Sequence, residues 1–493
     1  MTSNSLFTRA YQKACVALLL CAGAAIPSPA QTFTNLFSFN GTDGERPYAP
    51  LVQGMDGHLY GTTAGYGINP AGTVFKITAG GTLTTLYSFC AQASCADGAY
   101  PLAGLVQTND GTFYGTTYGG GTNNNGTVFK ITPGGTLTVL HTFCQTDCSD
   151  GVTPIAGLMQ GSDGAFYGTT YGGGVTGKGT VFRMSPKGKV TTLHNFDGSD
   201  GAMPEGGLVQ AADGNFYGTT YYGGSGECLG PGCGTVFKIT PRGEFTTLYT
   251  FCAQSYCPDG SNPVATLIEG ADGEFYGTTS TGGGTESACE GGCGTIFKIT
   301  SRGKLTTLYR FCSQNNCFEG TQPTGNLIQA TDRSFYGTTL VGGSGYNCNP
   351  DYGEGCGTVF KMASGQLITL HSFGTADVGS PWAGLMQDTN GSFYGTTTGG
   401  NATLGTVFSL AVGARRFVET HPTVGTVGAA VEILGTKLKG ATGVTFNETA
   451  AMFTVVSNTE IKTTVPAGAA TGFVTVTTPH GILKSNKKFR VVQ

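Results

Sequence analysis

Charged residues are scarce in this chain of 493 residues. They make up 11% of the sequence, against roughly 25% in an average soluble protein. The 26 Lys and Arg residues are outnumbered by 30 Asp and Glu residues, and the formal net charge is −4. A nucleic-acid-binding surface needs an excess of basic side chains to neutralise phosphates. The charge balance therefore argues against a nucleic-acid partner.

Two structural classes are also excluded. Glycine fills 83 positions, but in short patches, whereas a collagen needs it at every third place. Disorder is not expected of a chain with 39% hydrophobic and 11% aromatic residues, because these can bury a core. After the N-terminal segment, no apolar run approaches the roughly 20 residues of a membrane-spanning helix. We therefore expect a folded protein with no membrane span.

Residues 1–30 are typical of a secretory signal peptide. Arg9 and Lys13 precede an apolar stretch over residues 14–25, and small residues at 28–30 suit a signal peptidase. In an alternative reading, Cys21 is the acylated residue of a lipoprotein, although Leu20 stands where a small residue is expected. The segment predicts a protein that is secreted or displayed at the cell surface.

Internal repetition dominates the rest of the chain. The string Tyr-Gly-Thr-Thr begins at Tyr60, Tyr114, Tyr167, Tyr217, Tyr276, Tyr336 and Tyr394. The string Gly-Thr-Val/Ile-Phe begins at Gly72, Gly126, Gly179, Gly234, Gly294, Gly357 and Gly405. A third string, close to Thr-Leu-Tyr-x-Phe, ends at Phe39, Phe89, Phe143, Phe196, Phe251, Phe311 and Phe373. Each set has seven members, so the unit occurs seven times.

Each unit contains four short runs rich in Val, Thr, Tyr and Phe and bounded by turn residues, which predicts four strands. In the second unit these are residues 103–107, 113–117, 127–132 and 137–143. Asp110-Gly111 and Gly134-Gly135 separate neighbouring runs and suit tight hairpins. Repeated four-stranded sheets that must stack on one another indicate an all-β, seven-bladed β-propeller over residues 32–410.

The order of the strings predicts how the ring closes. If the Leu-Tyr-x-Phe run is the outermost strand, its first copy at residues 32–39 precedes every inner strand. The last unit ends at Leu410 without an outer strand of its own. We therefore expect residues 32–39 to form the rim of the seventh blade.

After a linker at residues 411–416, the repeated strings give way to runs of alternating Val, Thr and Ile. Residues 422–428, 431–436, 444–447, 465–469 and 474–479 resemble the IPT/TIG family of immunoglobulin-like domains. The resemblance covers residues 417–493 and implies a small β-sandwich that acts as a spacer or interaction module. The repeat strings are similar to the bacterial GloVer tandem repeat, a resemblance that implies secretion and supplies no activity.

Fourteen cysteines beyond the N-terminal segment form seven close pairs. They are Cys90/Cys95, Cys144/Cys148, Cys252/Cys257, Cys312/Cys317, Cys228/Cys233, Cys289/Cys293 and Cys348/Cys356. An even count in an exported chain predicts disulfides. The alternative is a metal site, but zinc needs four ligands at one point and no histidine accompanies any pair. In an up-down-up-down blade, all seven bridges fall on one face, together with the longest loops, where binding usually occurs.

The same face carries an acid four residues before a proline in every unit: Asp43, Asp97, Asp150, Asp200, Asp259, Glu319 and Asp377. A ring of carboxylates could bind a cation such as calcium. The favoured interpretation is a turn whose side chain accepts backbone N–H bonds. His141, His194 and His371 occupy a slot that holds tyrosine in other units, and we interpret them as fillers of the outer strand.

Trp382 and a group of loop tyrosines are the candidate ligand-binding residues. Trp382, the sole tryptophan, precedes the inner strand of the last unit, where it could hold a sugar ring or a protein, or plug the closure seam. Tyr118, Tyr171, Tyr221 and Tyr222 follow the Tyr-Gly-Thr-Thr string on the same face. They could extend a sugar-binding surface.

No catalytic motif is recognisable, and the chain implies no cofactor apart from the calcium alternative. We expect a non-catalytic binding or scaffold protein that recognises an extracellular glycan or protein through the disulfide-braced face. The main rival is a polysaccharide lyase or glycosidase, which needs a pair of carboxyl groups on one face. A structural cell-surface spacer is a third possibility, and the sequence does not indicate an oligomeric state.

Overall fold

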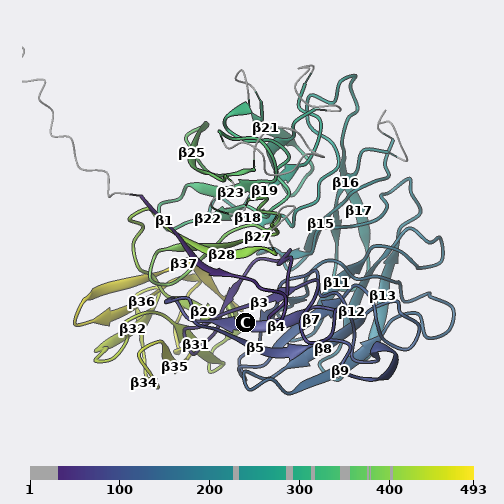
Figure 1. The fold of residues 1–493 in the computed structure, drawn as a ribbon. Coiled ribbons are helices and arrows are strands. Elements are labelled where there is room, and N and C mark those ends of the chain that lie inside the picture. Colours follow the sequence, from purple (N-terminus) through teal and green to yellow (C-terminus); the bar gives the residue numbers. More distant parts are fainter. Residues whose placement is uncertain are drawn as a thin grey trace, which may run out of the picture.

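The computed structural model describes residues 31–225, 232–284, 292–312, 317–344, 356–374, 377, 379–399 and 404–492. This part of the chain is built almost wholly of strands, and η1 (Ala93–Cys95) is a short 3-10 helix. None of the helices in these residues has the length and apolar character needed to cross a membrane. The repeat region and the C-terminal region form separate sets of sheets (Figure 1).

The repeat region forms four-stranded antiparallel sheets. The first three are β2 (Val52–Gln53), β3 (Leu59–Thr63), β4 (Thr73–Ile77), β5 (Leu83–Ser88); β6 (Val106–Gln107), β7 (Phe113–Thr117), β8 (Thr127–Ile131), β9 (Leu137–Thr142); and β10 (Met159–Gln160), β11 (Phe166–Thr170), β12 (Thr180–Met184), β13 (Val190–Asn195). The next three are β14 (Val209–Gln210), β15 (Phe216–Thr220), β16 (Thr235–Ile239), β17 (Phe245–Thr250); β18 (Ile268–Glu269), β19 (Phe275–Thr279), β20 (Thr295–Ile299), β21 (Leu305–Arg310); and β22 (Ile328–Gln329), β23 (Phe335–Thr339), β24 (Thr358–Ala363), β25 (Gln366–Ser372).

The last sheet of the repeat region joins the two ends of that region. It contains β26 (Met386–Gln387), β27 (Phe393–Thr397) and β28 (Thr406–Ala411), and its fourth strand is β1 (Thr32–Ser38). β1 runs antiparallel to β28, with partners from Thr32↔Ala411 to Ser38↔Thr406. The run at residues 32–39 therefore completes the last sheet, as the order of the repeated strings predicts.

Hydrophobic clusters between neighbouring sheets hold the repeat region together. Between the first two sheets, Tyr60 and Phe89 pack with Phe113 and Phe129, all fully or almost fully buried. Equivalent clusters lie at each following boundary. Another cluster joins the last sheet to the first and includes Phe39, Phe75, Tyr394 and Val407. Each buried ring removes apolar surface from water, which is worth roughly 1.5–3 kcal/mol. Because such a cluster also joins the last sheet to the first, the sheets form a closed ring.

The Tyr-Gly pair of the repeated string has a structural reason. The Tyr60 hydroxyl donates a hydrogen bond to the Asp56 carboxylate at 2.8 Å, which ties β3 to the preceding hairpin turn. A Cβ atom on Gly61 would lie 2.6 Å from Cζ of Phe75 on the neighbouring strand. Only glycine leaves room for that buried ring. Packing therefore explains why the glycine of the first string stands opposite the phenylalanine of the second.

The two threonines of the string make polar links. The Thr63 hydroxyl lies 2.8 Å from the hydroxyl of Thr73, which begins the next strand of the same sheet. The Thr62 hydroxyl donates instead to the Ala103 carbonyl of the following sheet at 3.0 Å. The same inter-sheet bond closes the ring where Thr396 donates to the Pro47 carbonyl at 3.0 Å. The repeated residues therefore serve the fold.

The inner strands are shorter than the sequence predicts. Residues 103–107 are expected to form a strand, but β6 covers only Val106–Gln107. The Ala103 carbonyl bonds to the previous sheet rather than to β7. Glutamine at the end of the inner strand adds a second link, because Gln107 Oε1 accepts the Met55 N–H at 3.1 Å. Gln53 accepts the Thr389 N–H at 3.0 Å in the same way. Side-chain bonds between sheets thus replace part of the inner ladder.

The C-terminal region is a β-sandwich. One sheet contains β29 (Glu419–His421), β31 (Ala430–Leu434), β35 (Glu460–Thr464) and β34 (Phe453–Val455). The other contains β30 (Val424–Thr426), β37 (Gly481–Val492), β36 (Gly472–Thr478), β32 (Gly443–Phe446) and β33 (Thr449–Ala451). Buried residues from both sheets, including Ile433, Ile461, Val474 and Phe489, form its core.

The C-terminal sandwich contacts the ring at the hairpins that follow the inner strands. Thr459 donates to the Met55 carbonyl of the first sheet at 2.9 Å. Arg490 donates to the carbonyls of Ala211 and Ala212 in the fourth sheet, at 3.3 and 2.5 Å. The first and fourth sheets lie on opposite sides of the ring. The sandwich therefore extends across the central axis at this end, where Figure 1 shows it packed against the ring.

Candidate functional site

The ring has two unlike faces. We call the face with the short hairpins after the inner strands, such as residues 108–112, the turn face. We call the opposite face, with the connections at residues 89–101 and 118–126 and their equivalents, the loop face. The C-terminal sandwich contacts the turn face, while the disulfides and the candidate aromatic residues belong to connections of the loop face. The contacts of the sandwich given above thus fall on the turn face and not on the loop face.

Disulfides brace the loop face. Bridges join Cys90 to Cys95, Cys144 to Cys148, Cys252 to Cys257, and Cys312 to Cys317. Cys233, Cys293 and Cys356 are also disulfide-bonded. Their expected partners, Cys228, Cys289 and Cys348, lie outside the described residues.

Cysteines from separate pairs come together, which the sequence does not predict. The sulfur atoms of Cys233, Cys252 and Cys257 lie within 4.8 Å of one another, and so do those of Cys293, Cys312 and Cys317. Each of these cysteines is disulfide-bonded. A metal would need the thiolate form, so the geometry supports stacked cystines rather than a zinc centre.

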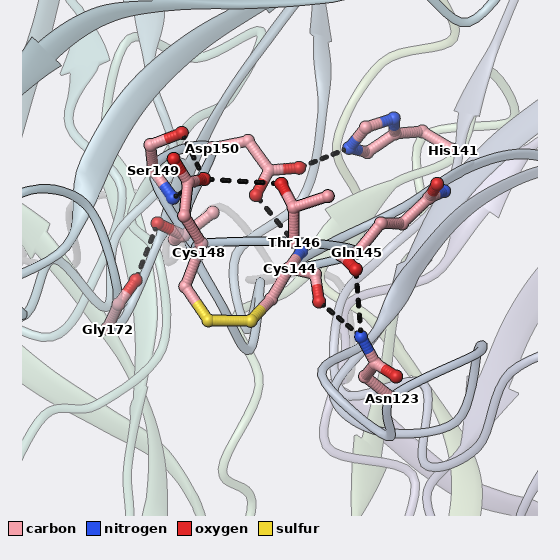
Figure 2. Close-up of a disulfide and its surroundings, with 11 residues drawn as sticks. Asn123, His141, Cys144, Gln145, Thr146, Cys148, Ser149, Asp150 and Gly172 are labelled. Carbon is pink, nitrogen blue, oxygen red and sulfur yellow. Dashed lines mark hydrogen bonds and ion pairs between the residues drawn. A yellow bond between two sulfur atoms is a disulfide. The ribbon is translucent and has the colours of Figure 1, made fainter.

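The repeated acids bind their own loops. Figure 2 shows the loop closed by the Cys144–Cys148 bridge, where the Asp150 carboxylate accepts the Cys144 N–H at 3.0 Å. Its other oxygen lies 2.8 Å from Nε2 of His141 on the outer strand. Elsewhere tyrosine replaces the histidine, as where Tyr87 donates to Asp97 at 2.7 Å. Histidine and tyrosine at this position thus both link the outer strand to the turn that contains the acid.

The remaining acids of this set have comparable contacts. Asp43 accepts the Asn40 N–H, Asp200 lies against His194, Asp259 accepts from Tyr249 and Cys252, Glu319 from Tyr309, and Asp377 lies against His371. These contacts favour the turn interpretation over a cation site. They also give the three histidines a polar partner that the sequence alone does not reveal.

A left-handed residue recurs in every connection from one sheet to the next. Arg46, Tyr100, Thr153, Met203, Asn262, Gln322 and Ser380 have φ between 51° and 66°. At Met203 the strain is held by two bonds, because its N–H donates to the Lys178 carbonyl at 2.8 Å and its carbonyl accepts the Tyr221 N–H at 3.2 Å. Such strain persists only where the surroundings over-determine it. The backbone is constant here while the side chain varies from unit to unit.

Four candidate tyrosines lie on three consecutive sheets. Tyr118, Tyr171 and Tyr221 each follow the second strand of their sheet, and Tyr222 pairs with Ala202 in an antiparallel bridge. The rings of Tyr221 and Tyr222 meet edge to face, with centroids 4.5 Å apart. Burial raises the pKa of Tyr221 to about 12, with smaller contributions from Tyr222 and Glu205. The structure therefore brings these two tyrosines together.

Glu205 is the one charged residue in its slot at the start of the innermost segments. We call the loop-face end of the ring axis, where these segments begin, the mouth of the ring. Glu205 precedes the inner strand β14, in the slot that holds Tyr48, Leu102, Ile155, Val264, Thr324 and Trp382 in the other sheets. The innermost segments touch around the axis, as where a Cβ on Gly206 would lie 2.8 Å from the Ala265 carbonyl oxygen. Burial raises the pKa of the Glu205 carboxyl to about 7. Glu205 is not among the candidates drawn from the sequence; its signal there is a single charge in an otherwise uncharged slot.

Trp382 lies at the seam between the last and first sheets. Its ring meets Tyr48 edge to face at 5.7 Å between centroids, and its carbonyl accepts a hydrogen bond from Thr324 at 3.0 Å. The indole nevertheless stays 36% exposed, and Tyr118 is 43% exposed. Trp382 thus contacts the closure seam and also presents a surface to solvent.

Within the described part of the chain, no hydrogen bond or ion pair joins Glu205 to another carboxyl group. Burial is the only influence on the pKa of Glu205, so among the described residues no second carboxyl group acts on it. Retaining glycosidases place their two carboxyl groups about 5–5.5 Å apart, and inverting ones about 6.5–9.5 Å apart. A partly buried acid can instead hold polar or cationic groups of a ligand.

Comparison with known protein families identifies the repeats. The model of the Gloeobacter/Verrucomicrobia repeat matches residues 25–160, 145–349 and 232–451, most of the chain. The chain belongs to this repeat family. The IPT/TIG domain model matches residues 417–491, in agreement with the resemblance of the C-terminal region. A search of curated proteins finds no match.

Solved structures with a similar fold are distant. One is the extracellular domain of a hybrid two-component system from B. thetaiotaomicron, with 11% identity, a TM-score of 0.48, and coverage of 94% of this chain and 59% of that one. Another is described as a gluconolactonase, with 12% identity, a TM-score of 0.38 and coverage of 78% and 94%. A third, an oxidoreductase described as a glucose dehydrogenase from Thermus thermophilus, has 14% identity, a TM-score of 0.38 and coverage of 78% and 100%. We transfer no activity from them.

Proposed function

We propose that this chain is an exported, non-catalytic binding protein, built as a seven-bladed propeller over residues 32–410, that recognises an extracellular glycan or protein through its loop face. The observation that carries the proposal is the placement of Tyr171, Tyr221 and Tyr222 after equivalent strands of two neighbouring sheets on the loop face, where the rings of Tyr221 and Tyr222 meet edge to face. Tyrosines offer large contact area with a polar end and favour both sugar and protein ligands.

The architecture supports this role in two further ways. The C-terminal sandwich bonds to hairpins of the turn face, so a ligand reaches the axis from the loop face. The loop-face connections are held by disulfides and by strained residues with two backbone bonds. A rigid surface loses little conformational entropy when a ligand binds, which favours affinity. Disulfides in these loops also suit the secreted or cell-surface location that residues 1–30 predict.

The proposal is tested with the protein expressed with residues 1–30 and purified after export. The wild-type protein and a Tyr171→Ala/Tyr221→Ala variant are applied to an array of glycans and to extracellular proteins from the source bacterium's own surroundings. We expect a specific ligand whose affinity falls at least about tenfold in the variant, the factor that 1.4 kcal/mol represents.

The matched control is Tyr256→Ala, which removes a tyrosine that is 74% exposed elsewhere on the loop face. This variant should bind as the wild type does. Absence of any ligand, or equal loss in both variants, would support the structural spacer instead. Conversion of a bound polysaccharide to shorter products would support the enzyme.

A further inference from the structure

The outer hairpins of the ring cover the neighbouring sheet. A Cβ atom on Gly135, in the hairpin between β8 and β9, would lie 2.6 Å from the Leu86 carbonyl oxygen on the outer strand of the preceding sheet. The same close approach recurs in the outer hairpins of the first, third, fourth and fifth sheets, at Gly81, Gly188, Gly243 and Gly303. Each of these hairpins therefore occupies the space beside the preceding outer strand.

The boundary between the sixth and last sheets is built differently. The last sheet takes its outer strand, β1, from the other end of the repeat region, so β28 continues into the linker and these two strands are not joined by a hairpin. The Leu370 carbonyl of β25 instead accepts a hydrogen bond from Nε2 of Gln31, which precedes β1. A cleft of about 630 Å³ lies here between the sixth sheet and residues 412–415. Small-molecule sites usually measure roughly 300–1,000 Å³, so the cleft is large enough for a ligand.

One wall of the cleft is apolar. Leu370, Val412 and Ala414 line it and pack against the hydrophobic cluster between the sixth and last sheets. Ile368 also lines it and is 53% exposed. Ile368 pairs with Lys361 of β24, and in the first five sheets the residue paired with the equivalent Lys or Arg is threonine: Thr84, Thr138, Thr191, Thr246 and Thr306. The sixth sheet thus presents an apolar side chain to the cleft where the other sheets have a hydroxyl.

Arg415 brings a positive charge to the same cleft. Lys361, the other cation of the lining, donates to the Asp332 carboxylate at 2.8 Å, and the Tyr336 hydroxyl donates to it at 2.9 Å. The Arg415 guanidinium is exposed and, among the described residues, forms no hydrogen bond or ion pair. A guanidinium can hold a carboxylate through two parallel hydrogen bonds. The charge left over in the cleft is therefore that of Arg415.

The two features together select the ligand. A cationic ligand would be repelled by Arg415. A small inorganic anion would leave Ile368 in water, and a neutral sugar would leave the guanidinium without a partner. A carboxylate on an apolar chain satisfies both features, because its head group pairs with Arg415 while its chain removes the apolar wall from water.

We propose that the cleft between the sixth sheet and the linker binds a small carboxylate with an apolar chain. Arg415 holds the carboxylate, and Ile368, Leu370 and Val412 contact the chain. An aliphatic acid and the carboxyl end of an apolar peptide present this same chemistry. The loop-face tyrosines follow strands of the second, third and fourth sheets, so this is a second site that does not depend on the proposed function.

The test is a calorimetric titration of the exported protein with two acids and their uncharged amides. The pairs are octanoate with octanamide, and N-acetyl-dileucine with its C-terminal amide. Acetate serves as the head group without a chain. We expect one acid to bind at least about tenfold more tightly than its amide and than acetate. Tighter binding of octanoate identifies an aliphatic acid as the source, and tighter binding of N-acetyl-dileucine identifies a peptide end.

Two variants separate the two halves of the site. Arg415→Gln should abolish the preference for the acid over its amide. Ile368→Thr introduces the residue that the other sheets carry, so it should fold, and it should weaken acid and amide alike by several-fold. The matched controls are Arg302→Gln, at an exposed arginine of an outer hairpin, and Thr138→Ile, at the equivalent position of the second sheet. Both controls should bind as the wild type does.

Three results would overturn the inference. The first is that neither acid binds more tightly than its amide. The second is that the preference for the acid survives Arg415→Gln, and the third is that Ile368→Thr leaves the affinity unchanged. None of these results bears on the proposed function, which is judged by the loss of ligand in the Tyr171→Ala/Tyr221→Ala variant.

Discussion

The two faces of the ring are made by the same repeated unit, yet they differ in what covers them. On the turn face, short hairpins of equal length contact the C-terminal sandwich through Thr459 and Arg490. On the loop face, connections of different length carry disulfides and side chains that change from unit to unit. Constant residues thus serve the ring, and the connections that vary between units are those that we propose for recognition.

One acidic residue on each face illustrates the difference. Asp388 precedes the hairpin of the last sheet on the turn face and is 2% exposed. Burial raises its pKa to about 6, although the Asn390 N–H donates to it at 2.6 Å, and the charge of Glu419 in the C-terminal region adds to the rise. Glu205 is also partly buried, but it lies at the open mouth. The first acid is part of an internal junction, while the second stays partly exposed.

The largest effect we expect follows from Asp388. Its pKa in the folded protein lies above the ordinary value, so the folded state holds the proton more tightly than the unfolded state. The stability this contributes is fully present below pH 4 and is lost as the pH rises through 6. Asp388→Asn cannot ionise. The free energy of unfolding of this variant should therefore exceed that of the wild type by up to about 3 kcal/mol at pH 8 and match it near pH 3.5, measured by urea denaturation.

The matched control has the opposite sign. Asp213 also belongs to a turn-face hairpin, and although burial alone would raise its pKa, hydrogen bonds from Asn215 and Tyr217 lower it overall. Asp213→Asn should therefore lose stability at neutral pH and approach the wild type only in acid. If both variants shift stability in the same direction, the contrast between a sealed acid and a hydrogen-bonded one does not hold.

Much of the architecture can be predicted from the repeated strings. Their order requires residues 32–39 to lie beside the last unit, and β1 pairs there with β28. The strand at residues 113–117 has the predicted bounds, because a run of Phe, Tyr and Thr between turn residues defines it locally. The inner strands are shorter because the Thr62 hydroxyl and the Gln107 amide bond across sheets. No local pattern reveals such partners more than 40 residues away.

The site was only partly predictable for the same reason. Tyr221 and Tyr222 could be selected because they are aromatic residues in a loop after the Tyr-Gly-Thr-Thr string, and the structure brings them together. Glu205 breaks the pattern of its slot, but its meaning depends on its burial. The docking of the C-terminal sandwich on the turn face depends on contacts such as Arg490 with Ala212, for which the sequence has no signal.

The next effect concerns the disulfides of the loop face. A bridge that closes a loop of four or five residues contributes about 2 kcal/mol by the chain-entropy relation. Cys144→Ser/Cys148→Ser should therefore lower the free energy of unfolding by about this amount. It should also weaken ligand binding, because the Cys148 carbonyl accepts the Gly174 N–H in the loop that follows Tyr171.

A second bridge separates stability from recognition. The Cys317 carbonyl accepts the Gly343 N–H in a loop that follows Leu340 and has no candidate tyrosine. Cys312→Ser/Cys317→Ser should cost a similar free energy of unfolding yet leave affinity for the ligand close to that of the wild type. Equal loss of affinity in both double variants would show that ligand binding depends on the loop face as a whole and not on a localised site.

The smallest effect we expect arises on the turn face. Arg490 donates to the carbonyls of Ala211 and Ala212, and hydrogen bonds from charged donors contribute about 1.5–3 kcal/mol. Because this guanidinium is only partly buried, Arg490→Ala should cost about 1–2 kcal/mol in urea denaturation, whereas Lys488→Ala, at an exposed neighbouring position, should cost nothing measurable. Ligand affinity should be unchanged in both variants, since neither residue reaches the loop face. If Arg490→Ala weakens ligand binding, the sandwich does more than cover the turn face, because a change at one end of the axis is then transmitted to the other.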